Sequence, residues 1–259
     1  MSHAIPHELL VAVAAIAALY STVGHGGASG YLAVLALAGV SAQAASSSAL
    51  MLNLIVAGIA FAAFGTAGHL SWRLSWPFLI GSAPFAFLGG SLKVSEGIYG
   101  ALLAAALSAA ALRLILEHAS RPLREIVPQA GEPSEAARPP VFAVSGPVGA
   151  GIGLVSGIVG VGGGIFLSPL MILLRWATPK QASATTALFI LVNSAAGLLG
   201  RWAQGSLDVG LAWPLLAAGI FGAFVGSSLG SWTFSGRALR QVLGVVLAVA
   251  AAKIGLGLL

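Results

Sequence analysis

Apolar residues occur in long runs along this chain, and polar positions are mostly confined to the short stretches between them. Ten apolar segments can be delimited, five on each side of one long polar stretch at 119–140. They are approximately Pro6–Val23, Gly30–Ala38, Ala42–Phe64, Ser75–Leu92, Glu96–Glu117, Val141–Val159, Ile165–Trp176, Gln181–Leu199, Val209–Trp232 and Ala238–Leu258. Such runs favour helices over the alternating ten-residue strands of a membrane barrel. The pattern predicts an all-α, polytopic integral membrane protein.

Composition supports a bilayer as the surrounding medium. Hydrophobic residues make up 58% of the chain and charged residues only 7%, whereas soluble domains carry about 25% charged residues. The basic residues are scattered singly between apolar segments, which does not indicate a nucleic-acid partner. Cysteine is absent, so no disulfide framework or thiolate metal site is expected, and we predict no cofactor. The N-terminus lacks the basic region of a cleaved signal peptide, so we expect the first apolar segment to remain.

The two sets of five segments share short motifs in the same order. Three pairs recur at an offset of 137 or 138 positions. They are Gln43-Ala44 with Gln181-Ala182, Trp76-Pro77 with Trp213-Pro214, and Ala86–Gly89 with Ala223–Gly226. An internal duplication explains this constant offset. We therefore predict membrane repeats at 1–118 and 141–259, joined by a linker at 119–140 whose prolines and mixed charges are typical of a connecting loop.

Each repeat contains a glycine-rich break after its first apolar segment, at Gly24–Gly27 and at Gly160–Gly164. In lipid, unwound backbone is tolerated only where protein or a water-filled cavity satisfies its polar groups. The segment after each break is too short to span, because the twelve residues Ile165–Trp176 make about 18 Å of helix against a core of about 30 Å. We predict a glycine-broken helical hairpin, either re-entrant or fully crossing, plus three further transmembrane helices per repeat.

The distribution of basic residues favours an inverted arrangement of the two repeats. If each hairpin returns to its own side, one side of the membrane receives nine of the twelve basic residues. These nine are Arg73, Arg113, Arg121, Arg124, Arg138, Arg175, Lys180, Arg237 and Arg240, and the other side receives Lys93, Arg201 and Lys253. Basic residues prefer the cytoplasmic side. We therefore predict a bacterial-type inner-membrane protein whose linker is cytoplasmic and whose two termini are outside.

Paired breaks at corresponding points of two halves indicate the central site of a transporter. The short helix after each break starts inside the membrane, where its free N–H groups and positive dipole end attract an anion. Hydroxyl-rich runs follow at 46–48 and 183–186, with an asparagine a couple of turns further along each helix. The predicted substrate-binding residues are Gly24, His25, Gly26, Gly27, Ser29, Ser47, Ser48, Asn53, Gly160, Gly162, Gly163, Gly164, Thr185, Thr186 and Asn193. Under the alternative interpretation, small residues only let helices pack closely and hydroxyls bond to their own helix.

His25 lies inside the first break, where the second break has Val161. Histidine titrates near neutral pH, so His25 is the candidate for a coupling proton; the alternative is that it only faces water at a hairpin tip. All seven acidic residues lie near segment ends or in the linker. The absence of a mid-span carboxylate argues against a cation site and for a small anionic or neutral substrate.

The first break also overlaps a sequence motif that is typical of a class of enzymes. Gly27–Gly30 fits the G-x-S-G pattern of rhomboid intramembrane serine proteases, with Ser29 as nucleophile and His69 as its partner. The duplication argues against this interpretation, because neither element recurs and Ser29 falls opposite Ile165. We therefore expect a transporter rather than an enzyme, with an uncoupled anion channel or facilitator as the other alternative.

The second repeat resembles the sulfite exporter TauE/SafE family, small anion permeases with duplicated halves. The resemblance rests on Gly160–Gly164, Pro169, Lys180–Ala182, Ala184–Leu188 and Asn193, and extends in outline along the whole chain. It implies export of sulfite, a sulfonate or a related sulfur oxyanion, driven by the proton gradient. The residues by themselves indicate only a small anion or a neutral polar solute.

The first repeat departs from the family pattern. Ala28 replaces the third glycine of the triplet, Ala33 stands where the proline would be, and His25 is inserted in the break. These differences leave open whether both breaks contact the substrate equally. The direction of transport, the coupling ion and the oligomeric state, a homo-oligomer included, are also left open.

Overall fold

The computed structural model describes residues 6–22, 24–119 and 140–230, together with 248, 251, 252 and 254–256; the side chains of 113–119, 179 and 228–230 are not described. Within these ranges all regular structure is α-helical, which confirms the predicted class. The helices are α1 (His7–Ser21), α2 (Ala28–Leu37), α3 (Ala42–Thr66), α4 (Trp72–Ser91), α5 (Glu96–Ala119), α6 (Phe142–Val159), α7 (Gly164–Leu173), α8 (Pro179–Ala203) and α9 (Ala212–Gly230). Most of the linker and of the predicted segment Ala238–Leu258 lies outside the described residues.

The helices follow the predicted apolar segments to within a few residues. By length and composition, α3, α6 and α8 are long and apolar enough to cross a membrane. By contrast, α2 and α7 have ten residues each, about 15 Å of helix, or half of a hydrocarbon core. The two helices that directly follow the glycine breaks are therefore half-length, as their sequences predicted.

The helices start at two opposite ends of the bundle. A cavity lined by Ser71, Phe142 and Gln181 brings together the starts of α4, α6 and α8, at what we call the Arg73 end. At the other end, the Gln43 side-chain amide donates to the carbonyl oxygen of Ser206, which joins the start of α3 to the connection before α9. We call this the Asp208 end.

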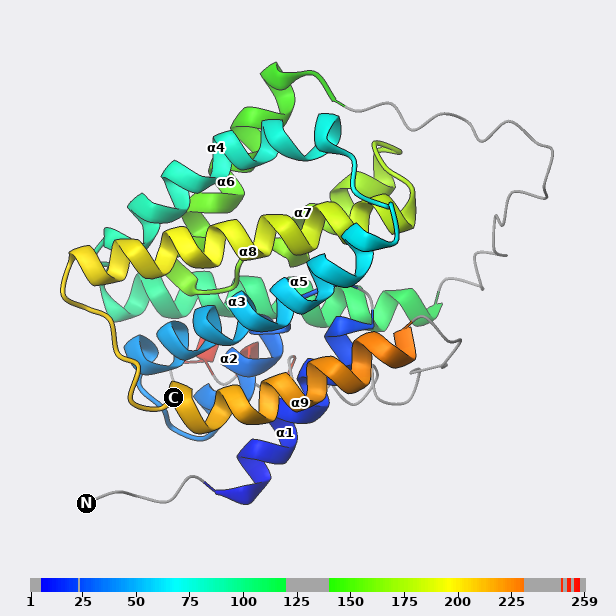
Figure 1. Ribbon diagram of the computed structural model, residues 1–259. Helices are drawn as coiled ribbons and strands as arrows, with labels where there is room; N and C mark the ends of the chain where they lie inside the picture. The colour runs from blue at the N-terminus through cyan, green and yellow to red at the C-terminus, as the bar shows by residue number, and fades with distance from the viewer. Residues whose placement is uncertain are drawn as a thin grey trace.

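Each break forms the tip of a helical hairpin. Because α6 and α8 both start at the Arg73 end, α6 and α7 leave that end and return to it. Equivalent helices of the two repeats run in opposite directions, as Figure 1 shows for α3 against α8 and for α4 against α9. This is the geometry that inverted repeats produce, and their orientation in a membrane stays a prediction.

The two repeats interlock through glycines. Gly149 and Gly153 of α6 lie against the backbone carbonyl oxygens of Phe78 and Ser82 in α4, so closely that a Cβ at either glycine would overlap the neighbouring helix. In the same way, Gly222 of α9 lies against the backbone of α1. Small residues of this kind allow helix backbones to approach closely in membranes. Each repeat thus packs its first helix on the fourth helix of the other.

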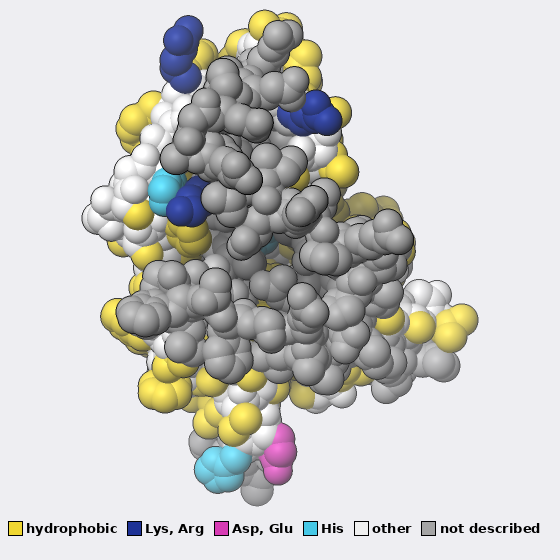
Figure 2. Space-filling view, turned by 90° about the vertical axis from the view of Figure 1, so that its right-hand side faces the viewer, with side chains coloured by type: hydrophobic (Ala, Val, Ile, Leu, Met, Phe, Trp, Pro, Cys, Tyr) yellow, Lys and Arg dark blue, Asp and Glu magenta, His cyan; other side chains and the backbone are white. Residues whose placement is uncertain are grey.

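The surface has the features of a membrane protein. Large exposed tryptophans lie at both ends: Trp72 and Trp76 near the Arg73 end, and Trp202, 70% exposed, with Trp213 near the Asp208 end. Tryptophan is enriched at the two membrane–water interfaces. Viewed from the right-hand side of Figure 1, Lys and Arg side chains lie on the upper part of the molecule (Figure 2).

Candidate functional site

The first break depends on glycine for its backbone conformation. Gly24 and Gly27 have φ angles of 74° and 93°, in the left-handed region, and Gly27 is the N-cap of α2. Between them, the backbone N–H of His25 donates to the carbonyl oxygen of Tyr20 at 3.0 Å. The break therefore reverses the chain at the end of α1 and directs α2 back toward the Asp208 end.

The second break repeats this geometry. Gly160, Gly162 and Gly163 have φ angles of 88°, 76° and 81°, which L side chains rarely adopt. Gly160 is the C-cap of α6 and Gly163 is the N-cap of α7. In both repeats a half-length helix thus begins inside the bundle directly after a left-handed glycine.

Each break contacts the long central helix of the other repeat. A Cβ on Gly24 would lie 2.9 Å from the Cβ of Ser183 in α8, and a Cβ on Gly160 would lie 2.9 Å from that of Ser46 in α3. Ser46 and Ser183 are 137 positions apart, the offset of the duplication. The two breaks therefore make reciprocal, equivalent contacts.

The two breaks meet at Asn53. Gly26 and Gly162 both lie against the side-chain amide of Asn53 in α3 and against the Cγ2 methyl of Ile190 in α8. The amide Nδ2 of Asn53 donates to the carbonyl oxygen of Val161 at 3.2 Å. Asn53 and Ile190 are 137 positions apart, so they are equivalent residues at the centre. Asn193, the asparagine of the second repeat, lies three positions further along α8 than Ile190.

Several buried polar atoms near the second break have no hydrogen-bond partner among the described residues. They include Asn53 Oδ1, both amide atoms of Asn193, and the hydroxyl oxygens of Ser194 and Thr186. A Cβ on Gly162 would lie 3.3 Å from Ser194 Oγ. Buried polar groups are costly unless they form hydrogen bonds. These atoms are available to a polar ligand.

Other predicted hydroxyls connect helices. Thr185 shares a hydrogen bond of 3.0 Å with Ser75 of α4, and Ser47 of α3 accepts from the backbone N–H of Asp208 at 3.4 Å. Ser48 is buried and its hydroxyl has no described partner. All three side chains lie on the central helices α3 and α8. The hydroxyls of Ser47 and Thr185 already form hydrogen bonds, to a neighbouring helix or connection.

His25 is buried, with 4% of its surface exposed. Together with Tyr20, Ser29 and Ile190 it lines a cavity of about 10 Å³, roughly the space that one water molecule needs. Ser29 bonds to the Tyr20 hydroxyl at 2.8 Å. This side of the centre is closed to anything larger than water. Within the described ranges, no cluster of three His, Asp or Glu residues could hold a metal ion.

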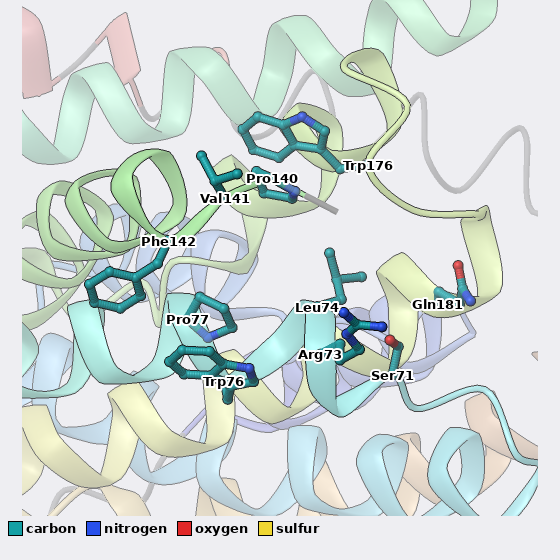
Figure 3. Close-up of a pocket in the computed structure, with 10 residues that line it drawn as sticks. All are labelled: Ser71, Arg73, Leu74, Trp76, Pro77, Pro140, Val141, Phe142, Trp176 and Gln181. Carbon is teal, nitrogen blue, oxygen red and sulfur yellow. The ribbon is translucent and has the colours of Figure 1, made fainter. Parts of the chain in front are cut away.

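A much larger cavity, of about 520 Å³, opens at the Arg73 end (Figure 3). In Figure 3, the rings of Trp76 and Phe142 lie on one side of it, and Arg73 with Ser71 lies on the other. An apolar cluster lies between this cavity, which its member Leu74 lines, and the second break. The cluster consists of Leu74, Phe78, Leu167, Met171, Ala177, Ala182 and Phe189, and a Cβ on Gly163 would lie 2.8 Å from the Phe189 ring.

One polar residue near the second break was not predicted as part of the site. Arg201 is only 7% exposed, and its Nη2 donates to the carbonyl oxygens of Gly157 and Ile158 at 3.0 and 2.9 Å. The sequence pattern grouped it with the basic residues that flank membrane segments. The duplication could have indicated that Arg201 is buried. The equivalent position, 137 residues earlier, is Phe64, which lies inside the apolar helix α3.

Comparison with known proteins agrees with this architecture. The family model described as sulfite exporter TauE/SafE matches residues 9–254. The chain belongs to the TauE/SafE family. A relative from Sinorhizobium fredii, described as a probable membrane transporter protein, is 39% identical over 247 residues, which cover 95% of this chain and 96% of the relative. No solved structure matches the chain. This TauE/SafE member is a multi-pass membrane protein and a membrane transporter.

Proposed function

We propose that this protein is a secondary transporter that moves a small anion, either sulfite, a sulfonate or a related sulfur oxyanion, across a bacterial-type inner membrane. The substrate binds where the two glycine breaks meet. The observation that carries this proposal is the position of Asn53 between Gly26 and Gly162, beside buried polar atoms that have no described partner. Membership of the TauE/SafE family supports the substrate class.

The chemistry of the centre suits an oxyanion. Asn193 Nδ2 and the hydroxyls of Thr186 and Ser194 are donors without described partners, and they introduce no fixed charge. The half-length helices α2 and α7 begin at the same place, so their N-terminal N–H groups and dipoles favour negative charge there. Glycine at the breaks lets a ligand approach the backbone.

The transport cycle follows from the opposed repeats. The central cavity of about 10 Å³ is too small for sulfite, so the described conformation is closed at the centre. Opening toward the Arg73 end requires the apolar cluster around Phe78 and Phe189 to separate, which connects the second break to the larger cavity. Opening toward the Asp208 end is the equivalent movement of the other repeat.

An uncoupled channel for the same anion is the alternative within transport, and no observation favours an intramembrane protease. The Ser29 hydroxyl bonds to Tyr20, and His69 follows α3 at the Arg73 end. Replacing Ser29 by Ala abolishes proteolysis if the chain is a protease, whereas transport does not need this hydroxyl as a nucleophile.

Flux measurements in proteoliposomes test the proposed function. Purified protein should take up radiolabelled sulfite or a sulfonate, but not a cation of similar size, and an imposed pH gradient should drive accumulation. Gly151→Ala is the matched control for later glycine variants, because Gly151 is exposed and a Cβ there meets nothing within 4 Å. Equilibration without accumulation indicates the channel. No uptake of any sulfur oxyanion would contradict the proposal.

Single cysteines test the proposed orientation, since the chain contains none of its own. Thr66 lies at the Arg73 end, Ser134 lies in the linker, and Gly97 lies at the Asp208 end with open space around it. An impermeant thiol reagent applied to intact cells should label Gly97→Cys but neither Thr66→Cys nor Ser134→Cys. The reverse pattern would place the Arg73 end outside. Equal labelling of Thr66→Cys and Gly97→Cys would contradict the proposed orientation, because it would put both ends of α4 on one side of the membrane.

A further inference from the structure

Arg201 lies beside the second break, two residues before the last residue of α8. Its side chain is almost entirely buried, and Nη2 contacts the last turn of α6 through the carbonyl oxygens of Gly157 and Ile158. These carbonyls directly precede the left-handed Gly160 that opens the break. A full positive charge is thus held within one turn of the second break.

Tyr99 completes a polar layer at this position. Its hydroxyl lies 3.4 Å from the carbonyl oxygen of Val159 and 3.4 Å from that of Ala42, the exposed first residue of α3. One turn further along α3, Ser46 is fully buried against Gly160. The layer therefore runs from the surface of the Asp208 end inward to the second break, and Arg201 contributes its only positive charge among the described residues.

The charge of Arg201 has no carboxylate partner among the described residues. A guanidinium has five N–H groups; the two of Nη2 suffice for the two carbonyl contacts, and Nε is buried without a partner. A buried cation is expensive unless it is paired. Ionisable residues inside membrane segments are rare and mark the pathways of substrates and ions. An anion that moved between the second break and the Asp208 end would meet these unused N–H groups.

We propose that Arg201 is a direct ligand of the transported anion, on the Asp208-end side of the second break. The N–H groups that face away from α6 bind the oxyanion, while Nη2 keeps the guanidinium fixed against the α6 carbonyls. This inference deepens the proposed function and rests on it. It assigns the site a fixed positive charge, so the preferred ligand is an anion and a neutral polar solute is excluded.

The duplication shows that this charge is present on one side only. The position equivalent to Arg201 holds Phe64, whose ring would lie 3.2 Å from a Cβ on Gly24 in the first break. An aromatic ring and a guanidinium thus occupy matching places next to the two breaks. The anion is therefore bound more tightly on the Asp208-end side, and the two directions of transport differ in apparent affinity.

A purely structural role is the competing explanation, because a cation at a helix C-terminus also stabilises the helix dipole. Arg201→Gln separates the two roles, since glutamine keeps a polar side chain with an N–H donor but carries no charge. If Arg201 binds the anion, Arg201→Gln should raise the KM for radiolabelled sulfite at least tenfold, and Arg201→Lys should recover part of the loss. Lys93→Gln is the matched control, because it removes an exposed cation at the same end.

Thermal stability gives a second readout that does not require transport. Sulfite should raise the Tm of the wild-type protein and of Lys93→Gln, but not that of Arg201→Gln, and the Tm without sulfite should remain close to wild type. A wild-type KM in Arg201→Gln, or an undiminished Tm increase with sulfite, would overturn the inference. If Arg201→Gln does not fold, the same two measurements on Arg201→Lys decide, because lysine keeps the charge without the guanidinium geometry. Failure of the wild-type protein to transport any sulfur oxyanion would instead count against the proposed function.

Discussion

The two glycine breaks have the same backbone geometry and different chemistry. Gly24 contacts Ser183 and Gly160 contacts Ser46 at equivalent points of the opposite repeats. Their other neighbours differ: the first break contains His25 and has Phe64 beside Gly24, whereas the second has Val161 inside it and the guanidinium of Arg201 at the corresponding place. The duplicated scaffold is nearly symmetric, and its polar groups are not.

This difference indicates that the two repeats contribute different chemical groups to the proposed site. Both breaks contain left-handed glycines, and a half-length helix follows each of them. The first break adds a titratable imidazole, and the second adds a fixed positive charge nearby together with most of the unpaired amide and hydroxyl atoms. We therefore expect equivalent substitutions in the two breaks to have unequal effects.

The largest effect is expected in the second break, from Gly162→Ala. A Cβ there would lie 2.5 Å from Asn53 Nδ2, and the φ of 76° strains any L residue. Transport in proteoliposomes should fall below a tenth of wild type, with normal membrane insertion.

The equivalent glycine of the first break sharpens the comparison. Gly26→Ala also meets the Asn53 amide, but the backbone of Gly26 is not in the left-handed region, so a shift of one side chain relieves the overlap. We expect a smaller loss for Gly26→Ala than for Gly162→Ala, with Gly151→Ala unchanged. Equal and full activity of all three variants would leave the glycines as packing residues only.

Asn53→Ile removes the asymmetry at the centre, because it places the same residue at both equivalent positions. The variant loses the hydrogen bond to the Val161 carbonyl and the side-chain amide that, among the described residues, touches both breaks. Uptake should fall at least tenfold, whereas Ile190→Val, a conservative change at the equivalent position, should keep most of the flux. Loss of uptake only in Ile190→Val would contradict the assigned roles.

His25→Gln tests whether the first break carries the coupling proton. Glutamine keeps a hydrogen-bonding side chain in a position that also faces Tyr20, but it does not titrate. Flux measured against pH should lose its slope between about pH 5.5 and 7.5, where imidazole ordinarily titrates, with a change of a few-fold at most in sulfite affinity. An unchanged pH profile would remove His25 from coupling, which then proceeds through protonation of the substrate or is absent.

The smallest effect concerns the ends of the half-length helices. After α2 the chain continues through Gly39 at a φ of 73°, and after α7 through Arg175 at a φ of 54°, the equivalent position. A non-glycine residue in this conformation costs about 1 kcal/mol. Thermal unfolding in detergent should show Arg175→Gly to be more stable than wild type by up to about 1 kcal/mol and Gly39→Ala to be less stable by about as much. Opposite signs would show that side-chain contacts of Arg175 outweigh its backbone strain.

The sequence predicted the helices, the duplication and the hairpins because each follows from local pattern: apolar length, motif offset, and glycine where the chain must reverse. It could not predict which face of α3 or α8 a hydroxyl occupies, since Ser47 and Thr185 share a run with Ser48 and Thr186 but bond to the neighbouring helix or connection. Arg201 was grouped with the surface basic residues for a similar reason. Its burial depends on the carbonyls of α6, 43 and 44 positions away in the chain.

The glycine contacts between α4 and α6, and between α1 and α9, also constrain how the protein is made. The first repeat leaves the ribosome with α1 and α4 complete, but the surfaces that receive Gly149, Gly153 and Gly222 have no partner until the second repeat has been synthesised. Until then, we expect these surfaces of the first repeat to face lipid. We therefore expect that neither half, expressed alone, reaches the helix packing that it has in the whole chain.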